Sequence, residues 1–218
     1  MWFRPFPPPR EELEAEGLRR PGGMKVGITA FGSPKRYKIL EGISEFQSFI
    51  EENSKIKVDI WFVQESILPA GDIPLDKNNA CYMVDQDKLS SDSQGKMPSG
   101  MKTNIVVYDT QDRVPICYGG LTWGFRKPTP QISIPYNNNA KWDRGWKTSL
   151  APTLVHEFTH ALYAMLKAQR IEGFKDLPDI DRAHDYNFTE SADPGWINFR
   201  KWCLDKITQE MADALMKD

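Results

Sequence analysis

An apolar segment, a helical segment and a second apolar segment follow one another early in the chain. Segments 25–31 and 57–63 are rich in Val, Ile and aromatic residues, as buried strands are. Between them, apolar residues recur at a spacing of three or four as far as Asn53, which predicts a helix. The recurring positions are Ile39, Leu40, Ile43, Phe46, Phe49 and Ile50. Two strands joined by a helix over about forty residues predict a right-handed βαβ unit with parallel strands.

Three further strands are predicted downstream. Segments 103–109 and 131–136 read as a third and a fifth buried strand. Segment 116–125 is interrupted by glycines, which favours a fourth strand at an exposed sheet edge. Segment 69–100 is polar and rich in turn residues, so we expect a long surface loop there, with a short strand at 81–84.

His156, Glu157 and His160 lie in segment 153–166, where apolar residues recur at helical spacing. Residues four apart share one face of a helix. His156 and His160 can therefore each offer a ring nitrogen to one metal ion, and Glu157 is placed to act as general base on a water bound there. His-Glu-x-x-His at this spacing predicts a site for one catalytic Zn²⁺ ion.

The order of these elements, together with His156-Glu157-Phe158-Thr159-His160, resembles that of the zincin metallopeptidases over about residues 25–170. The resemblance implies an α+β fold: a twisted, mixed five-stranded sheet with two helices in an upper lobe, a smaller, mainly helical C-terminal lobe, and an active-site cleft between them. In that family the edge strand binds an extended peptide by strand addition. The substrate-binding residues implied here are Gly119, Gly120, Leu121, Thr122 and Trp123.

A zincin needs a third protein ligand, and the sequence leaves two candidates open. The metzincin branch has Gly and His where this chain has Tyr163 and Leu166, so the resemblance is to gluzincins or SprT-like zincins. His184 begins a His-x-x-x-Phe segment similar to the SprT-like pattern, whereas Glu190 resembles the gluzincin ligand. Zinc accepts either an imidazole nitrogen or a carboxylate oxygen. Tyr186 is the implied catalytic group that polarises the substrate carbonyl.

The N-terminal residues differ from the rest of the chain. Residues 1–23 are proline-rich, then charged, and end in Arg-Pro-Gly-Gly, which predicts a flexible arm. Residues 24–218 are expected to form a single zincin-like catalytic domain, with an upper lobe over about 24–170 and a lower lobe over about 171–218. The lower lobe is expected to end in an amphipathic helix that begins near Pro194.

Composition and net charge argue against several classes of function. A net charge of −2 gives no strong attraction to nucleic acid or to a membrane surface, and no apolar run is long enough to span a bilayer. Three widely spaced cysteines predict no disulfide framework and are compatible with a reducing compartment. No signal peptide is recognised, so a cytoplasmic location is the default expectation. Neither the compartment nor the oligomeric state follows from the sequence.

These features together predict a zinc-dependent metalloendopeptidase that hydrolyses peptide bonds in a peptide or protein substrate. The alternative is a catalytically idle zincin-like domain that binds peptide or has a structural role. The presence of Glu157 favours the enzyme, because a general base has no role in peptide binding alone.

Overall fold

The computed structural model describes residues 17–32, 35–66, 75–76, 81–82, 86–109, 120–123, 129–136, 150–175 and 203–217. Its strands are β1 (Met24–Phe31), β2 (Val58–Glu65), β3 (Leu75–Asp76), β4 (Cys81–Tyr82), β5 (Thr103–Asp109), β6 (Leu121–Trp123) and β7 (Gln131–Tyr136). Its helices are α2 (Arg36–Asn53), α3 (Gln86–Gln94), α4 (Ala151–Ala168) and α6 (Gln209–Met216). No helix within these ranges has the length and apolar character needed to cross a membrane.

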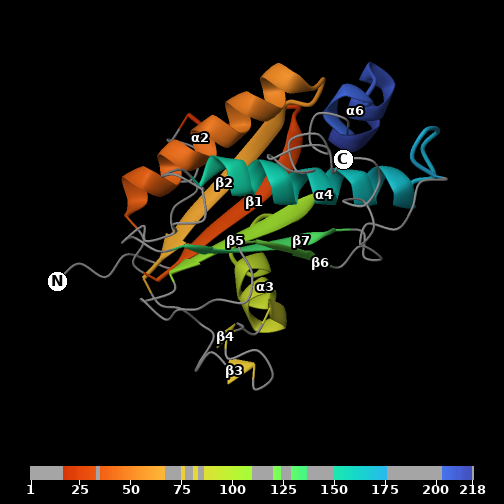
Figure 1. The fold of residues 1–218 in the computed structure, drawn as a ribbon. Helices are drawn as coiled ribbons and strands as arrows, with labels where there is room; N and C mark the ends of the chain where they lie inside the picture. The colour runs from red at the N-terminus through yellow and green to blue at the C-terminus, as the bar shows by residue number, and fades with distance from the viewer. Residues whose placement is uncertain are drawn as a thin grey trace, which may run out of the picture.

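Four long strands form the body of the sheet in the order β2-β1-β5-β7, and all of them are parallel (Figure 1). Each contributes six to eight residues. The strands are buried along almost their whole length, as expected where both faces of a parallel sheet are covered. The short strand β6 pairs antiparallel with the outer edge of β7. The predicted βαβ unit is confirmed, because β1 and β2 are parallel and α2 connects them.

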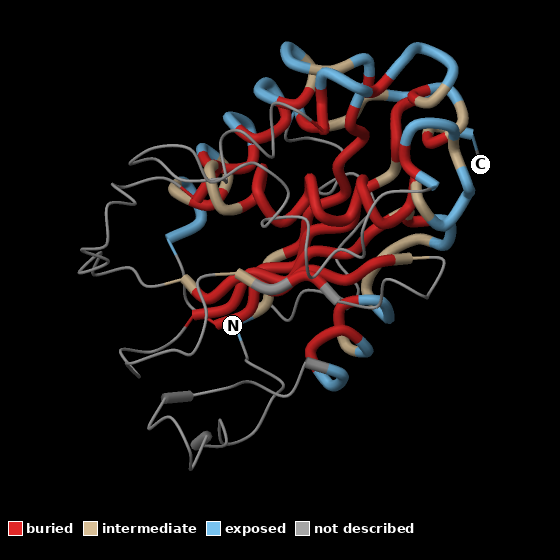
Figure 2. The backbone as a smooth tube through the Cα atoms, turned by 45° about the vertical axis from the view of Figure 1, so that its right-hand side comes forward, coloured by how far each residue is buried: buried red, intermediate tan, exposed pale blue. Residues whose placement is uncertain are grey.

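The main hydrophobic core lies between the sheet and the two long helices, α2 and α4 (Figure 1). Phe46 of α2 and Phe158 of α4 meet there edge to face, with ring centroids 5.1 Å apart. The sheet contributes alternate residues of each parallel strand, among them Val26, Ile28, Ile60, Ile105, Val107 and Ile132. α3 covers the other face, where the hydroxyl groups of Thr29 and Ser93 are hydrogen-bonded at 2.8 Å. Figure 2 shows the long strands buried over most of their length, with intermediate exposure near some of their ends, and the helices exposed mainly on their outer sides.

The predicted fold class, an α+β zincin-like domain with a mixed five-stranded sheet, is wrong. The body of the sheet is all parallel and helices pack alongside it on both faces, which is an α/β arrangement. β6 adds only three residues of antiparallel pairing at the edge. The expected helical C-terminal lobe is also not seen as a separate core among the described residues. Leu204, Ile207 and Leu215 belong to the same buried cluster as the strands.

Two predictions about individual elements also need correction. Residues 86–94 were expected in a surface loop but form α3, in which Leu89 is the only large apolar residue. α3 is held instead by buried serines, with Ser90 donating a hydrogen bond to Gln131 at 2.8 Å. The amphipathic helix predicted from near Pro194 to Leu215 is interrupted within its described part, because the chain leaves the helical conformation before Thr208. Thr208 then caps α6 by accepting a hydrogen bond from the Met211 N–H.

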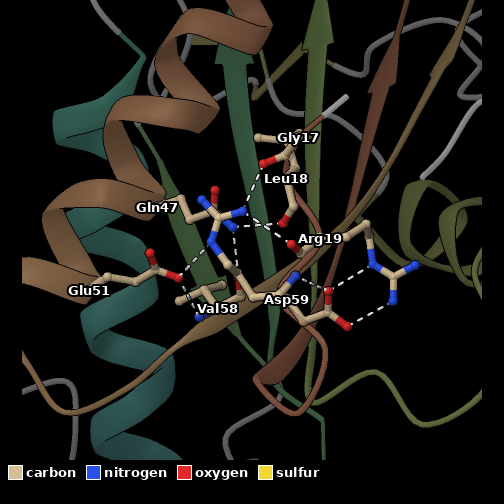
Figure 3. A network of polar contacts seen from close by, with 8 residues as sticks. Gly17, Leu18, Arg19, Gln47, Glu51, Val58 and Asp59 are labelled. Atoms are coloured by element: carbon tan, nitrogen blue, oxygen red, sulfur yellow. Dashed lines mark hydrogen bonds and ion pairs between the residues drawn. The ribbon is translucent and has the colours of Figure 1, made fainter. Parts of the chain in front are cut away.

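Residues 17–23, part of the predicted arm, are folded against the β2 edge of the sheet (Figure 3). The Leu18 carbonyl accepts hydrogen bonds from the Ile60 N–H and from the Gln47 side chain. Arg19 forms two hydrogen bonds to the Asp59 carboxylate at 2.7 and 2.9 Å and lies over the Trp61 ring. This segment therefore covers part of an edge that would otherwise expose unpaired backbone groups. Residues 1–16 lie outside the described ranges.

We expect the Arg19–Asp59 pair to make stability depend on acid pH. Burial raises the pKa of Asp59, but hydrogen bonds from Arg19 and Arg20 outweigh it, so the net pKa lies below the usual 3.8. The contribution is then fully present above that value and disappears as the pH falls through the lowered pKa. Urea unfolding should show Asp59→Asn less stable than wild type by about 1.5–3 kcal/mol at neutral pH. A difference that persists undiminished near pH 2 would contradict this account.

Candidate metal and catalytic site

The helix that carries the motif is the most buried helix of the described chain. α4 begins at Ala151 with Pro152 in its first turn, where a missing N–H costs nothing, and it ends at Ala168. Every residue from Leu154 to Leu166 is buried. The predicted helix over 153–166 is therefore confirmed, and its three polar motif residues are enclosed in the molecule.

His156 and His160 lie one turn apart, and their side chains meet. Their Nε2 atoms are 3.1 Å apart, and the two rings are perpendicular with centroids at 4.6 Å. Two nitrogens bound to a tetrahedral zinc ion at about 2.0–2.1 Å are about 3.3–3.4 Å from one another. The observed separation is within a few tenths of an ångström of that value, so the pair fits two ligands of one zinc ion. The same separation fits a hydrogen bond between two neutral imidazoles.

The carboxyl group of Glu157 is buried, and burial raises its pKa. It is 6 % exposed, and burial raises its pKa to about 7, while a hydrogen bond from Thr122 acts in the opposite direction. A carboxylate with a pKa near the working pH is suited to taking up and returning a proton. The buried position of Glu157 on α4 is therefore consistent with the general-base role predicted from the motif.

The edge strand β6 lies directly against this carboxyl group. The Thr122 hydroxyl is 2.5 Å from Oε2 of Glu157 and 3.0 Å from its main-chain oxygen. Gly120 comes so close that a Cβ atom there would be 2.6 Å from Oε1 of Glu157. Both residues were predicted to bind substrate, and the structure shows that they contact Glu157. No sequence pattern signals the contact of Thr122 with Glu157, because these two residues are 35 positions apart.

The other predicted substrate-binding residues are only partly described. The main chains of Leu121 and Trp123 pair with Ser133 and Gln131 of β7, which places them in the edge strand as predicted. Gly119 lies outside the described ranges.

The third ligand is not located by the structure. His184, Tyr186 and Glu190 all lie in 176–202, outside the described ranges. Within the ranges that are described, no group of three His, Cys, Asp or Glu side chains is placed to hold a metal ion. His184, its alternative Glu190, and the carbonyl-polarising role of Tyr186 therefore stay predictions.

Comparison of the chain with protein-family models, with curated proteins and with solved structures finds no match. The functional argument therefore rests on the motif and on the arrangement of α4 and β6.

Proposed function

We propose that this chain is a zinc-dependent peptidase. The observation that carries the proposal is the arrangement on α4, where two imidazole nitrogens lie 3.1 Å apart and the residue between them in the motif is a buried carboxyl group. A metal-free histidine pair explains the distance equally well, but it gives no reason for a buried glutamate beside it. Burying an ionisable carboxyl group costs stability, and such groups are concentrated at functional sites.

His156 and His160 would be two of the zinc ligands, with His184 or Glu190 as the third. When bound there, zinc supplies Lewis acidity, which lowers the pKa of a coordinated water to about 7. Glu157 would accept a proton from that water and pass it to the amine that leaves when the peptide bond breaks.

A peptide substrate is favoured by the position of β6. One edge of this strand pairs with β7, and no strand of the described chain pairs with its other edge. An extended peptide can add to such an edge through main-chain hydrogen bonds. Since Thr122 of β6 touches Glu157, a peptide bound along this edge would lie close to the general base.

The test is cleavage of an unfolded protein substrate, such as reduced and alkylated casein, by the purified chain loaded with one equivalent of zinc. We expect fragments to accumulate, cleavage to stop when a zinc chelator is added, and cleavage to return when zinc is restored. Failure of the zinc-loaded protein to cleave any unfolded substrate, or cleavage that is unchanged by the chelator, would overturn the proposal.

A further inference from the structure

Thr122 of β6 and Gly120, which directly precedes β6, make unusually close contact with the side chain of Glu157. The Thr122 hydroxyl lies within hydrogen-bond distance of both the Glu157 carboxylate and the Glu157 main-chain oxygen, at 2.5 and 3.0 Å. A hydroxyl group has one proton to donate, and a hydrogen bond to a carboxylate is stronger than one to a neutral carbonyl. Thr122 is itself 7 % exposed, so this bond is shielded from water. It is therefore a well-placed restraint on the orientation of the carboxylate.

Gly120 restrains the same carboxyl group by leaving room for it. A Cβ atom at position 120 would be 2.6, 2.8 and 2.9 Å from Oε1, Cγ and Cδ of Glu157. Carbon atoms do not approach so closely without one of them moving. The backbone of Gly120 does not need the left-handed region, so alanine is compatible with the main chain there. Its substitution would therefore act mainly by pushing the Glu157 side chain away.

We propose that β6 and the glycine directly before it position the general base: Thr122 holds the Glu157 carboxylate, and Gly120 provides the space for it. The inference rests on the proposed function for its catalytic meaning. It assigns Thr122 as a positioning residue that acts through Glu157. It also couples two events at the site. A peptide that pairs with the edge of β6 to which no described strand is bonded would fix the strand, and through Thr122 it would fix the base.

The catalytic test compares Thr122→Val, which removes the hydroxyl at nearly constant volume, with Thr122→Ser, which keeps it. We expect Thr122→Val to lower kcat by about 10- to 100-fold, the value of one hydrogen bond to a charged group, with KM changed by less than about twofold. Thr122→Ser should restore most of the loss. Gly120→Ala, which removes no polar group, should also lower kcat. A rise in KM with kcat unchanged in Thr122→Val would overturn the proposal and leave Thr122 as a substrate contact.

A second measurement does not depend on activity. In the metal-free protein, Thr122→Val should lower the urea midpoint clearly when Glu157 is present and by much less in the Glu157→Met background, where the hydroxyl has only the main-chain oxygen at 3.0 Å as its acceptor. This double-mutant cycle isolates the contact between the two side chains. Equal shifts in both backgrounds would overturn the positioning role, whatever the activity. Coupling in the cycle together with no zinc-dependent cleavage in the wild type would instead overturn the proposed peptidase and the catalytic part of this inference with it.

Discussion

Replacing Glu157 by glutamine is expected to lower kcat/KM for peptide cleavage by about 10²–10⁴-fold, the usual contribution of a general acid–base group. Glutamine has nearly the same shape and can still accept the hydrogen bond from Thr122. It cannot take up a proton at neutral pH, so proton transfer should be lost while the structure around it is kept. The measurement is the initial rate of peptide cleavage at pH 7 with zinc-loaded protein.

The matched control for this variant is Glu172→Gln. Glu172 has a side chain that is 84 % exposed and pairs with Lys175 at the surface. The control changes charge in the same way and should keep full activity. Zinc content should be unchanged in both variants, because neither substitution removes a proposed ligand. A Glu157→Gln protein as active as the wild type would rule out Glu157 as the general base.

Phe158→Ala is expected to reduce the free energy of unfolding by about 3–5 kcal/mol, the range for truncating a fully buried phenylalanine. Phe158 has no exposed surface and packs edge to face against Phe46, so alanine would leave a cavity between α2 and α4. Phe158 lies two residues from each histidine, on the opposite side of the helix. It therefore holds α4 in place from behind the metal-binding face.

Urea unfolding of the metal-free protein measures this effect without a contribution from zinc binding. Phe49→Ala is the control, because Phe49 is also on a helix of this layer but is 40 % exposed. It should cost about 1 kcal/mol or less. Folded Phe158→Ala protein should still bind zinc. Equal destabilisation by the two substitutions would show that the Phe46–Phe158 contact is not part of the core that supports α4.

Most elements of the fold could be predicted from local pattern, but the fold class could not. Apolar residues at strand or helix spacing predict six elements: β1, β2, β5, β7, α2 and α4. α3 lacks such a pattern, because its buried face combines one apolar residue, Leu89, with Ser90 and Ser93, whose hydroxyls are hydrogen-bonded to Gln131 and Thr29. Because the sequence does not predict α3, it gives no sign that a helix covers the second face of the sheet. The predicted fold class is therefore an α+β domain with a mixed sheet and not an α/β domain whose parallel sheet is covered on both faces.

In the candidate site, too, contacts within one helix could be predicted from the sequence, whereas contacts between distant segments could not. The spacing of His156 and His160 is local, so the meeting of their Nε2 atoms follows from one turn of helix. The contact of Thr122 with Glu157 joins a sheet edge to a helix and depends on how β6 pairs with β7. The contacts of Leu18 and Arg19 also depend on residues distant in the sequence. The composition of residues 1–23 predicts a flexible arm, but Leu18 and Arg19 are hydrogen-bonded to Gln47 of α2 and Asp59 of β2.

The zinc content of the purified chain tests the central claim most directly. Elemental analysis should find about one zinc ion per wild-type chain after reconstitution at neutral pH. The double variant His156→Ala/His160→Ala should retain almost none, whereas Glu157→Gln should retain it all. Of His184→Ala and Glu190→Ala, the one that loses zinc identifies the third ligand. A wild-type chain that binds no zinc, or binds it equally well without both histidines, would contradict the account and leave His156 and His160 as a hydrogen-bonded pair.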